Sequence, residues 1–408
     1  MKIRYLLLHA YGSGGTIRTV FNQANSMRAA GHDVEVVSVL RGRDEPRFHL
    51  DPRIPITVLV DEREHTPADD RHGGPLARLQ AGRRGKLTGR PAQHIPPGEF
   101  GAQYFNAYVE RSLIRYLRRL RDGVLVSTRP ALNILTAQYA PSGVTLVAQE
   151  HMNLSVYKKD VRAAIARHYA RFDAIAVLAE SDREEYERML PGARIVRIPN
   201  AVHAVRQRHT TYANHIAVAA GRLFWQKGFD LLIPAFQQVI ADHPDWQLRI
   251  YGSGERRDEL RALIDAHHLY NHILLMGHTT QLDEELAKAS FYVLSSRFEG
   301  LPMVMIEAMT HGLPVVSFDC PTGPAEVITH GKEGLLVPPE DVDALAEAMR
   351  ELMADEGLRA DMGAAALVAA HSYAPEAVHP QWEQLFEELQ AARLGATRRV
   401  EAGDTPTG

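Results

Sequence analysis

The hydrophobic positions of this chain fall into short continuous runs that alternate with helical patterns. The first forty residues contain the apolar run IRYLLLHAY, the glycine turn GSGG at 12–15, a helical stretch from about Thr16 to Ala30, and the run VEVVSVL. Unbroken apolar runs are typical of parallel strands that helices cover on both faces. This order therefore predicts a βαβ unit and favours a doubly wound α/β domain.

The same alternation occurs twice along the 408 residues, which indicates two α/β domains. Runs such as GVLVST, TLVAQE and AIAVLAE belong to the first set, and a second set starts near His215 with HIAVAAGR. A polar, basic stretch at 203–214 separates them. We place the first domain at 1–205 and the second at 206–374. A helix at 375–395 is expected to cross back to the first domain, and the tail at 396–408 to be disordered.

Residues 61–100 interrupt the alternation. The acidic piece DEREHTPADD leads into a basic segment with many Gly and Pro residues and poor apolar periodicity. This composition predicts a mobile loop or insertion. Two interpretations stay open: a solvated surface loop, or a flap whose Arg and Lys residues meet an anionic acceptor or a membrane surface.

The composition is that of a soluble globular enzyme, with 45% hydrophobic and 24% charged residues. A net charge of −4 gives no signal for a nucleic-acid partner. The single cysteine, Cys320, excludes an internal disulfide and fits a reducing compartment. No apolar run reaches the length of a membrane span. We expect a cytoplasmic protein and keep peripheral contact with the inner face of the membrane open.

The segment SSRFEGLPMVMIEAM carries two glutamates, Glu299 and Glu307, separated by a Gly-Leu-Pro turn. Proline suits the start of a helix, so we predict a helix that begins near Pro302 or Met303. Glu299 then precedes the helix and Glu307 lies about one turn inside it. Because a helix N-terminus attracts phosphate, the two carboxylates can hold hydroxyls on either side of a bound phosphate. A nucleotide-sugar has this arrangement of groups.

Several other polar groups follow predicted strands, where ligands of α/β domains bind. In GRLFWQKG, Arg222 comes directly after a strand and Lys227 five residues later, a pair that suits a diphosphate. The alternative for this pair is ordinary solvated side chains. The remaining candidates are Gly14 and Gly15 in the glycine turn, His151 in QEHMN and Gly277 in MGH. For these, a simple tight turn or a structural histidine is the alternative.

Taken together, the chain resembles the family-4 retaining glycosyltransferases. The resemblance rests on GRLFWQKG, on EGLPMVMIEAM with its two spaced glutamates, on HGLPVVSFD and on KEGLLVPPEDVDALAEAM, and it covers nearly the whole chain. It implies the GT-B architecture, an α/β fold of two facing Rossmann-like domains with the active site in the interdomain cleft. The segment DCPTGPAEVI, where many relatives carry a Gly-Gly pair, resembles a subgroup that often uses UDP-sugars. We therefore favour UDP over GDP and expect Glu326 to shape the donor pocket.

The resemblance also implies roles for individual residues. Arg222 and Lys227 would bind the donor diphosphate, while Glu299 contacts the transferred sugar and Glu307 the ribose. His151 would lie near the sugar. The implied backbone contacts to phosphate or acceptor come from Gly14, Gly15, Gly300, Leu301 and Met303. Gly277 is a candidate for the donor site on its position after a strand, where its backbone can line a nucleotide.

The implied reaction moves a hexose from a nucleotide-diphosphate sugar to an acceptor hydroxyl with retention of the anomeric configuration. The expected acceptor is a glycan, a lipid-linked sugar or a polymer precursor. Arg222 and Lys227 would supply the charge that the departing diphosphate needs, so we expect no metal and no cofactor. Two alternatives stay open: a sugar-nucleotide epimerase or phosphorylase on the same scaffold, and a non-catalytic nucleotide-sugar-binding protein.

Overall fold

The computed structural model describes residues 1–63, 85–202 and 209–401 of the chain. The chain divides into two compact units, one formed by residues 1–198 together with 379–408, the other by residues 199–378. The units are described below as unit 1 and unit 2, each by itself.

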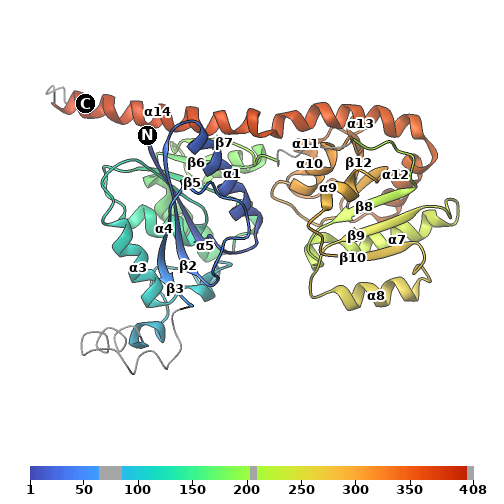
Figure 1. Cartoon of the computed structure of the whole chain (residues 1–408), viewed down its shortest axis with the longest axis horizontal. Coiled ribbons are helices and arrows are strands. Elements are labelled where there is room, and N and C mark those ends of the chain that lie inside the picture. The colour runs from blue at the N-terminus through green and yellow to red at the C-terminus, as the bar shows by residue number, and fades with distance from the viewer. Residues whose placement is uncertain (64–84, 203–208, 402–408) are drawn as a thin grey trace. The chain divides into compact units, whose positions relative to one another are not determined.

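Unit 1 is built on a seven-stranded parallel sheet with the order β3-β2-β1-β4-β5-β6-β7. Its central strands β4, β5 and β6 are buried along their whole length, because helices cover both faces of the sheet (Figure 1). The strands are β1 (Lys2–His9), β2 (Asp33–Arg41), β3 (Ile56–Asp61), β4 (Val124–Ser127), β5 (Thr145–Gln149), β6 (Ala174–Val177) and β7 (Ile195–Arg197).

The helices of unit 1 begin where local chemistry favours a start. Asn106 accepts hydrogen bonds from the backbone N–H groups of Tyr108 and Val109, and Pro130 opens the helix after β4. The helix predicted from Thr16 is confirmed. The helices are α1 (Gly15–Ala29), α3 (Ala107–Leu117), α4 (Pro130–Tyr139), α5 (Lys159–His168), α6 (Glu180–Met189) and α14 (Pro375–Glu401), with single 3-10 turns η2 (Ala102–Tyr104), η3 (Leu154–Val156) and η4 (Tyr169–Arg171).

Helix α14 runs along the edge of the first sheet at which the strands begin (Figure 1). Its Glu388 pairs with Arg194 just before β7, and Gln390 donates to Thr145 at the start of β5. Phe386 on the same helix is fully buried. The helix extends to Glu401, into the segment 396–408 that the sequence predicts as a disordered tail, and residues 402–408 lie outside the described residues.

Buried polar contacts hold the last part of the predicted mobile loop or insertion at 61–100. The buried carboxylate of Glu110 accepts hydrogen bonds from the backbone N–H groups of Gln93 and His94 at 2.7–3.1 Å. Glu99, also buried, is bonded to Arg129. These polar contacts fix residues 93–99 against α3 and the end of β4, while residues 64–84 lie outside the described residues.

Unit 2 contains a six-stranded parallel sheet with the order β10-β9-β8-β11-β12-β13. Its strands are β8 (Ile216–Ala220), β9 (Gln247–Tyr251), β10 (Ile273–Gly277), β11 (Phe291–Leu294), β12 (Val315–Phe318) and β13 (Gly334–Val337). Its helices are α7 (Phe229–Ile240), α8 (Arg257–Ala266), α9 (Leu282–Leu286), α10 (Met303–Met309), α11 (Pro324–Val327), α12 (Val342–Ala354) and α13 (Glu356–Ala370), with 3-10 turns η5 (Trp225–Lys227) and η6 (His371–Tyr373). The predicted start of α10 is confirmed.

Each sheet has one topological switch point, where successive crossovers change direction. It lies between β1 and β4 in unit 1 and between β8 and β11 in unit 2. Ligands of such sheets bind outside the carboxyl ends of the strands at this point. The topology therefore directs attention to the loops after β1 and β4, and to those after β8 and β11.

No helix within the described ranges combines the length and the apolar character that crossing a bilayer requires.

Helix α14 offers a matched test of its packing on unit 1. We expect Phe386→Ala to lower the free energy of unfolding of unit 1 by about 3–5 kcal/mol, because the ring is fully buried. The control Leu394→Ala, at a side chain that is 62% exposed, should change it by less than about 0.5 kcal/mol. Urea denaturation followed by circular dichroism measures both. If Phe386→Ala lowered the free energy of unfolding by as little as the control does, α14 would contribute little to the stability of unit 1.

Candidate active site

An ion pair joins the two loops at the switch point of unit 2. The Nζ atom of Lys227 lies 2.5 Å from Oε1 of Glu299, a residue 72 positions further along the chain. The Glu299 side chain is only 7% exposed, and that of Lys227 is 18% exposed. Because a buried carboxylate is costly without a partner, Glu299 holds the ammonium group at the carboxyl edge of the sheet.

Further hydrogen bonds fix these loops to each other. Gln226 donates from Nε2 to the carbonyl of Phe298 at 2.9 Å, and the Ser295 hydroxyl donates to the carbonyl of Lys227 at 2.9 Å. Gly228 has a φ of +61°, and a Cβ atom there would lie 1.9 Å from the carbonyl oxygen of Ser295. Only glycine allows this close approach. The turn that carries Lys227 is therefore held tightly against the backbone of Ser295.

Arg297 ties the same two loops together from the side. Its guanidinium group donates to Asp230 at 2.8 and 3.0 Å and to the carbonyl of Trp225 at 2.7 Å. It also lies over the Trp225 ring, 4.7 Å from the centroid. This forked contact holds the η5 turn that ends at Lys227, so Arg297 has a positioning role.

The other predicted donor residues of unit 2 are distributed along the same edge. Arg222 is exposed in the turn after β8, with its guanidinium 5.9 Å from the Phe224 ring centroid. Glu307 lies half-buried on α10. Gly277 ends β10, and its carbonyl accepts a hydrogen bond from Gly252 N–H. Arg222 therefore follows a strand of the sheet, Gly277 ends one, and Glu307 lies on the helix after β11.

The turn from Gly300 to Met303 is compact. The backbone N–H of Met303 donates to the carbonyl of Leu301 at 2.8 Å. A Cβ atom at Gly323, whose φ is +105°, would lie 2.8 Å from Cδ of Pro302. The loop after β12 therefore packs directly on this turn and needs glycine to do so.

Two groups buried beneath this edge of the sheet have raised pKa values. Burial and then Glu299 raise the pKa of the Cys320 thiol to about 12, although Lys227 opposes the shift. Burial also raises the pKa of Tyr292, with Glu299 as the next cause. Cys320 therefore stays a neutral thiol at neutral pH and does not act as a nucleophile.

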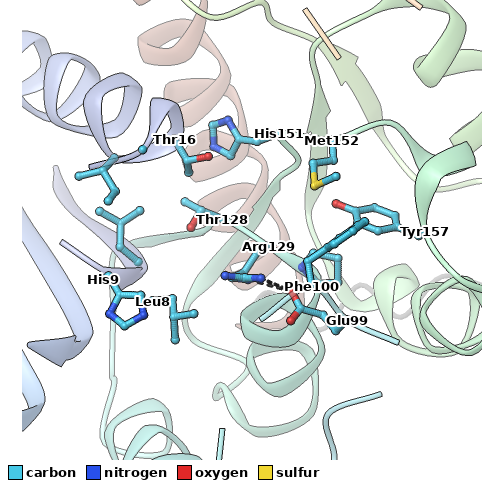
Figure 2. Close-up of a pocket in the computed structure, with 14 residues that line it drawn as sticks. Leu8, His9, Thr16, Glu99, Phe100, Thr128, Arg129, His151, Met152 and Tyr157 are labelled. Atoms are coloured by element: carbon cyan, nitrogen blue, oxygen red, sulfur yellow. Dashed lines mark hydrogen bonds and ion pairs between the residues drawn. The ribbon is translucent and has the colours of Figure 1, made fainter. Parts of the chain in front are cut away.

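A cavity of about 240 Å³ lies at the switch point of unit 1. Figure 2 shows that side chains from β1, α1, the loop at 99–100, the start of α4 and the loop after β5 surround it. Gly14 lines the cavity, and a Cβ atom at Gly15 would meet nothing within 4 Å. The remaining lining residues are Leu7, Leu8, His9, Thr16, Ile17, Glu99, Phe100, Thr128, Arg129, Pro130, His151, Met152 and Tyr157.

His151 reaches this cavity from the end of β5 (Figure 2). Both of its ring nitrogens are buried and have no hydrogen-bond partner within the described part of the chain. Burial lowers the pKa of His151 to about 4, so the ring is neutral at neutral pH. An unsatisfied buried imidazole is costly, and a ligand hydroxyl would satisfy it.

A buried hydrogen-bond network lies next to His151. Glu150 accepts hydrogen bonds from the Asn133 amide at 2.8 Å, the Tyr157 hydroxyl at 2.7 Å and the Tyr169 hydroxyl at 2.5 Å. Burial raises the pKa of Glu150, and these donors oppose the shift. The network fixes the ring of Tyr157, which lines the cavity.

Sequence reasoning missed three groups that shape these sites: Arg297, the Glu150 network, and the ion pair of Arg129 with Glu99. Arg129 lies two residues after strand β4, and the same position after β8 is the signal that singled out Arg222. Glu99 gave no such signal, because it lies in a segment of poor periodicity. Within the described residues, no cluster of three or more His, Cys, Asp or Glu side chains could hold a metal ion.

Comparison with known families agrees with this division of the chain. Residues 206–367 match the family model "Glycosyl transferases group 1", and residues 14–201 match "Glycosyl transferase 4-like domain". The two matches cover most of both units.

Similar proteins include an exopolysaccharide phosphotransferase of Streptomyces coelicolor, 37% identical over 407 residues. That match covers 99% of this chain but only 42% of the relative, so the chain spans less than half of that protein. The amylovoran biosynthesis glycosyltransferase AmsD of Erwinia amylovora is 26% identical over 67% of this chain and 80% of its own length.

Among solved structures, a mutant of S. aureus TarM in complex with Fondaparinux, alpha-GlcNAc-glycerol and UDP has a TM-score of 0.74. It is 18% identical and covers 94% of this chain and 99% of its own, a likeness that shows the fold. The two parallel sheets with their helices thus define an α/β protein of the GT-B class. The chain belongs to the group 1 glycosyltransferases. The predicted α/β fold of the GT-B class, the group 1 family and the class of glycosyltransferase enzymes are confirmed.

The lowered pKa of His151 makes a prediction about acid stability. The folded pKa of about 4 lies below the ordinary value of 6.5, so the unfolded chain binds more protons between these values. Stability from the neutral ring is present above pH 6.5 and is lost as the pH falls. We expect wild type to lose about 2 kcal/mol more than His151→Asn between about pH 7 and pH 5.

Urea unfolding at several pH values measures this difference, and the carbon chemical shifts of the His151 ring report its charge directly. Titration of the ring near pH 6.5 in the folded protein would contradict the burial of its nitrogens.

Proposed function

We propose that the chain transfers a hexose from a UDP-sugar to a hydroxyl of a glycan or polymer acceptor, with retention of the anomeric configuration. The observation that carries the proposal is the ion pair of Lys227 with the buried Glu299 at the switch point of unit 2. A carboxylate buried at that edge holds a cation where the diphosphate of a nucleotide-sugar would bind.

The donor would occupy the carboxyl edge of the second sheet. An ammonium group has three N–H donors, so Lys227 can keep its bond to Glu299 and still donate to a phosphate oxygen. Arg222, exposed in the same turn, adds a forked donor. We assign the sugar hydroxyls to Glu299, the ribose to Glu307, and further phosphate contacts to the backbone of Gly300, Leu301 and Met303.

The chemical step develops negative charge on the departing diphosphate. Fixed cations near that charge lower the barrier because they need no reorganisation during the reaction. Glu299 and the contacts around Gly228 and Arg297 hold Lys227 in place before the donor arrives. Because Lys227 and Arg222 supply the charge, we propose that the reaction requires no metal.

Retention can arise in two ways. A carboxylate can form a covalent sugar intermediate, as in retaining glycosidases. Glu299 is a poor nucleophile because its Oε1 accepts hydrogen bonds from both Lys227 and Ser296 at 2.5 Å. We therefore propose front-face attack, in which the acceptor oxygen bonds to the anomeric carbon as the diphosphate leaves. A phosphate oxygen then takes the acceptor proton.

The relatives support the choice of substrates. UDP is named in the TarM complex, which favours a UDP-sugar donor. The Streptomyces relative is named an exopolysaccharide phosphotransferase and the Erwinia relative an amylovoran biosynthesis glycosyltransferase. Both names favour a polysaccharide precursor as the acceptor. The cytoplasmic location stays a prediction.

Replacement of Lys227 tests the donor site. We expect Lys227→Met to lower turnover of the preferred UDP-sugar by about 100-fold or more, the loss typical of one preorganised charge partner. UDP release in the presence of a glycan acceptor measures it. The control Lys288→Met removes an ammonium whose side chain is 50% exposed on the same unit, and it should leave turnover within about two-fold.

The double variant Lys227→Met with Glu299→Gln separates chemistry from folding, because it leaves no unpaired buried charge. Activity of Lys227→Met within a few-fold of wild type would contradict the donor assignment. Formation of an epimerised donor without acceptor would support the sugar-nucleotide epimerase. Consumption of phosphate would support the phosphorylase, and tight UDP binding without any transfer would support the non-catalytic binding protein.

The stereochemistry tests the retaining mechanism. With an α-linked UDP-hexose as donor, we expect an α-linked product, because acceptor and diphosphate share one face of the sugar. The anomeric proton of the product in an NMR spectrum shows the configuration. A β-linked product would contradict retention while leaving the donor site intact.

A further inference from the structure

Asp230, in the first turn of α7, binds two arginine side chains at once. Its Oδ2 accepts a hydrogen bond from Nη2 of Arg297 at 2.8 Å, and its Oδ1 accepts one from Nη1 of the same residue at 3.0 Å. Oδ1 also accepts a hydrogen bond from Nη1 of Arg256 at 3.2 Å. Arg256 lies in the loop after β9 and Arg297 in the loop after β11, so one carboxylate joins three segments of unit 2.

Arg297 connects Asp230 to the segment directly before Lys227. Its guanidinium donates to the carbonyl of Trp225 at 2.7 Å, and its backbone N–H donates to the carbonyl of Gln226 at 2.8 Å. Two successive carbonyl groups of the turn are therefore bound by one residue. Because the same guanidinium is bound to Asp230, the carboxylate fixes the direction from which it reaches the turn.

Arg256 connects Asp230 to the other end of this turn, next to Arg222. The backbone N–H of Arg256 donates to the carbonyl of Leu223 at 3.2 Å. The N–H of Leu223 in turn donates to the carbonyl of Ser253 at 2.9 Å. Both backbone polar groups of the residue after Arg222 are therefore bonded to the loop that carries Arg256.

The charge balance of this cluster depends mainly on Asp230. Arg256 also pairs with Glu259, and Arg297 with Glu340, but these two glutamate side chains are 59% and 53% exposed. The Asp230 side chain is only 23% exposed, so solvent screens its contacts less. Burial acts to raise the pKa of Asp230, but the hydrogen bonds and charge of Arg297 outweigh it and lower the pKa. The carboxylate is therefore ionised at neutral pH.

An acidic residue in the first turn of a helix has a second, purely structural effect, because it stabilises the helix dipole. Asp343 provides a comparison, since it is the second residue of α12 as Asp230 is of α7. Asp343 is exposed and accepts a hydrogen bond from the neutral amide of Gln238 at 2.8 Å. The two aspartates share the helix position, whereas the bonds to two arginines that contact the turn at 222–227 belong to Asp230.

We propose that Asp230 is a positioning residue of the donor site, which sets the relative position of Arg222 and Lys227 through Arg256 and Arg297. Two cations on one short turn must match the spacing of the phosphate oxygens that they bind. A small displacement of either cation then weakens diphosphate binding and slows the reaction. The inference rests on the proposed function, because it concerns the same donor site.

The variant Asp230→Asn tests this role, because it keeps the shape of the side chain and removes its charge. We expect it to weaken the affinity for UDP by about 5-fold or more and to leave the affinity for uridine unchanged. Turnover of the preferred UDP-sugar should fall by about 10-fold or more, since the cations are no longer preorganised. Calorimetric titration of the full chain with UDP and with uridine measures the two affinities, and UDP release measures turnover.

A second variant, Arg256→Met, removes one of the two connections and should also weaken UDP but not uridine. Combined with Asp230→Asn, it should cost less than the product of the two single losses, because both substitutions break the same contact. The controls are Asp343→Asn on α12 and Asp242→Asn, which removes an exposed pair with Arg350. Both controls should bind UDP as wild type does.

Three results would overturn the positioning role: Asp230→Asn binds UDP and turns over as wild type does, it loses affinity for UDP and uridine equally, or the losses of the two single variants multiply. If Asp230→Asn did not fold in urea-unfolding measurements, the comparison of UDP with uridine on Arg256→Met would decide. Failure of the proposed function gives a different pattern, because wild type would then not bind UDP or Lys227→Met would bind it equally well.

Discussion

The buried carboxylate of Glu299 is the constraint around which the second unit arranges its candidate active site. A carboxylate beneath the surface needs a cation and full hydrogen bonding, and Lys227 and Ser296 provide them. The two loops must therefore approach closely, which the glycine at 228 permits and the fork of Arg297 stabilises. Rigid loops are a requirement for electrostatic catalysis, because a preorganised charge stabilises a leaving group without reorganisation.

The first unit uses the same physical device. There Glu99 is buried and holds Arg129 at the switch point between β1 and β4. In both units a glutamate from one loop orients a cation from another, at the edge where parallel strands end. The device turns a flexible basic side chain into a donor with a fixed direction, which is what recognition of sugar hydroxyls or phosphate oxygens requires. Neutral His151, which lines the same cavity as Arg129, adds ring nitrogens without adding charge.

The sequence predicted the parts of this structure that depend on local pattern. Continuous apolar runs indicated the parallel strands, and the Gly-Leu-Pro turn indicated the start of α10, because both follow from short-range periodicity and backbone geometry. Arg222 and Lys227 were singled out as candidates because they follow a strand. Glu99 was not found, since its partner lies thirty residues away in the chain and its segment has no periodicity. The conformation of residues 93–99 depends on buried tertiary contacts with Glu110 and Arg129. Patterns in a single sequence do not encode such contacts.

The central claim is that Lys227, held by Glu299, binds the diphosphate of the donor. Calorimetric titration of wild type and Lys227→Met with UDP and with uridine tests it most directly, because the two ligands differ only in the diphosphate. The account predicts that the substitution weakens the affinity for UDP by about 10-fold or more and leaves the affinity for uridine unchanged. Equal affinity of both proteins for UDP, or an equal loss for UDP and uridine, would contradict it.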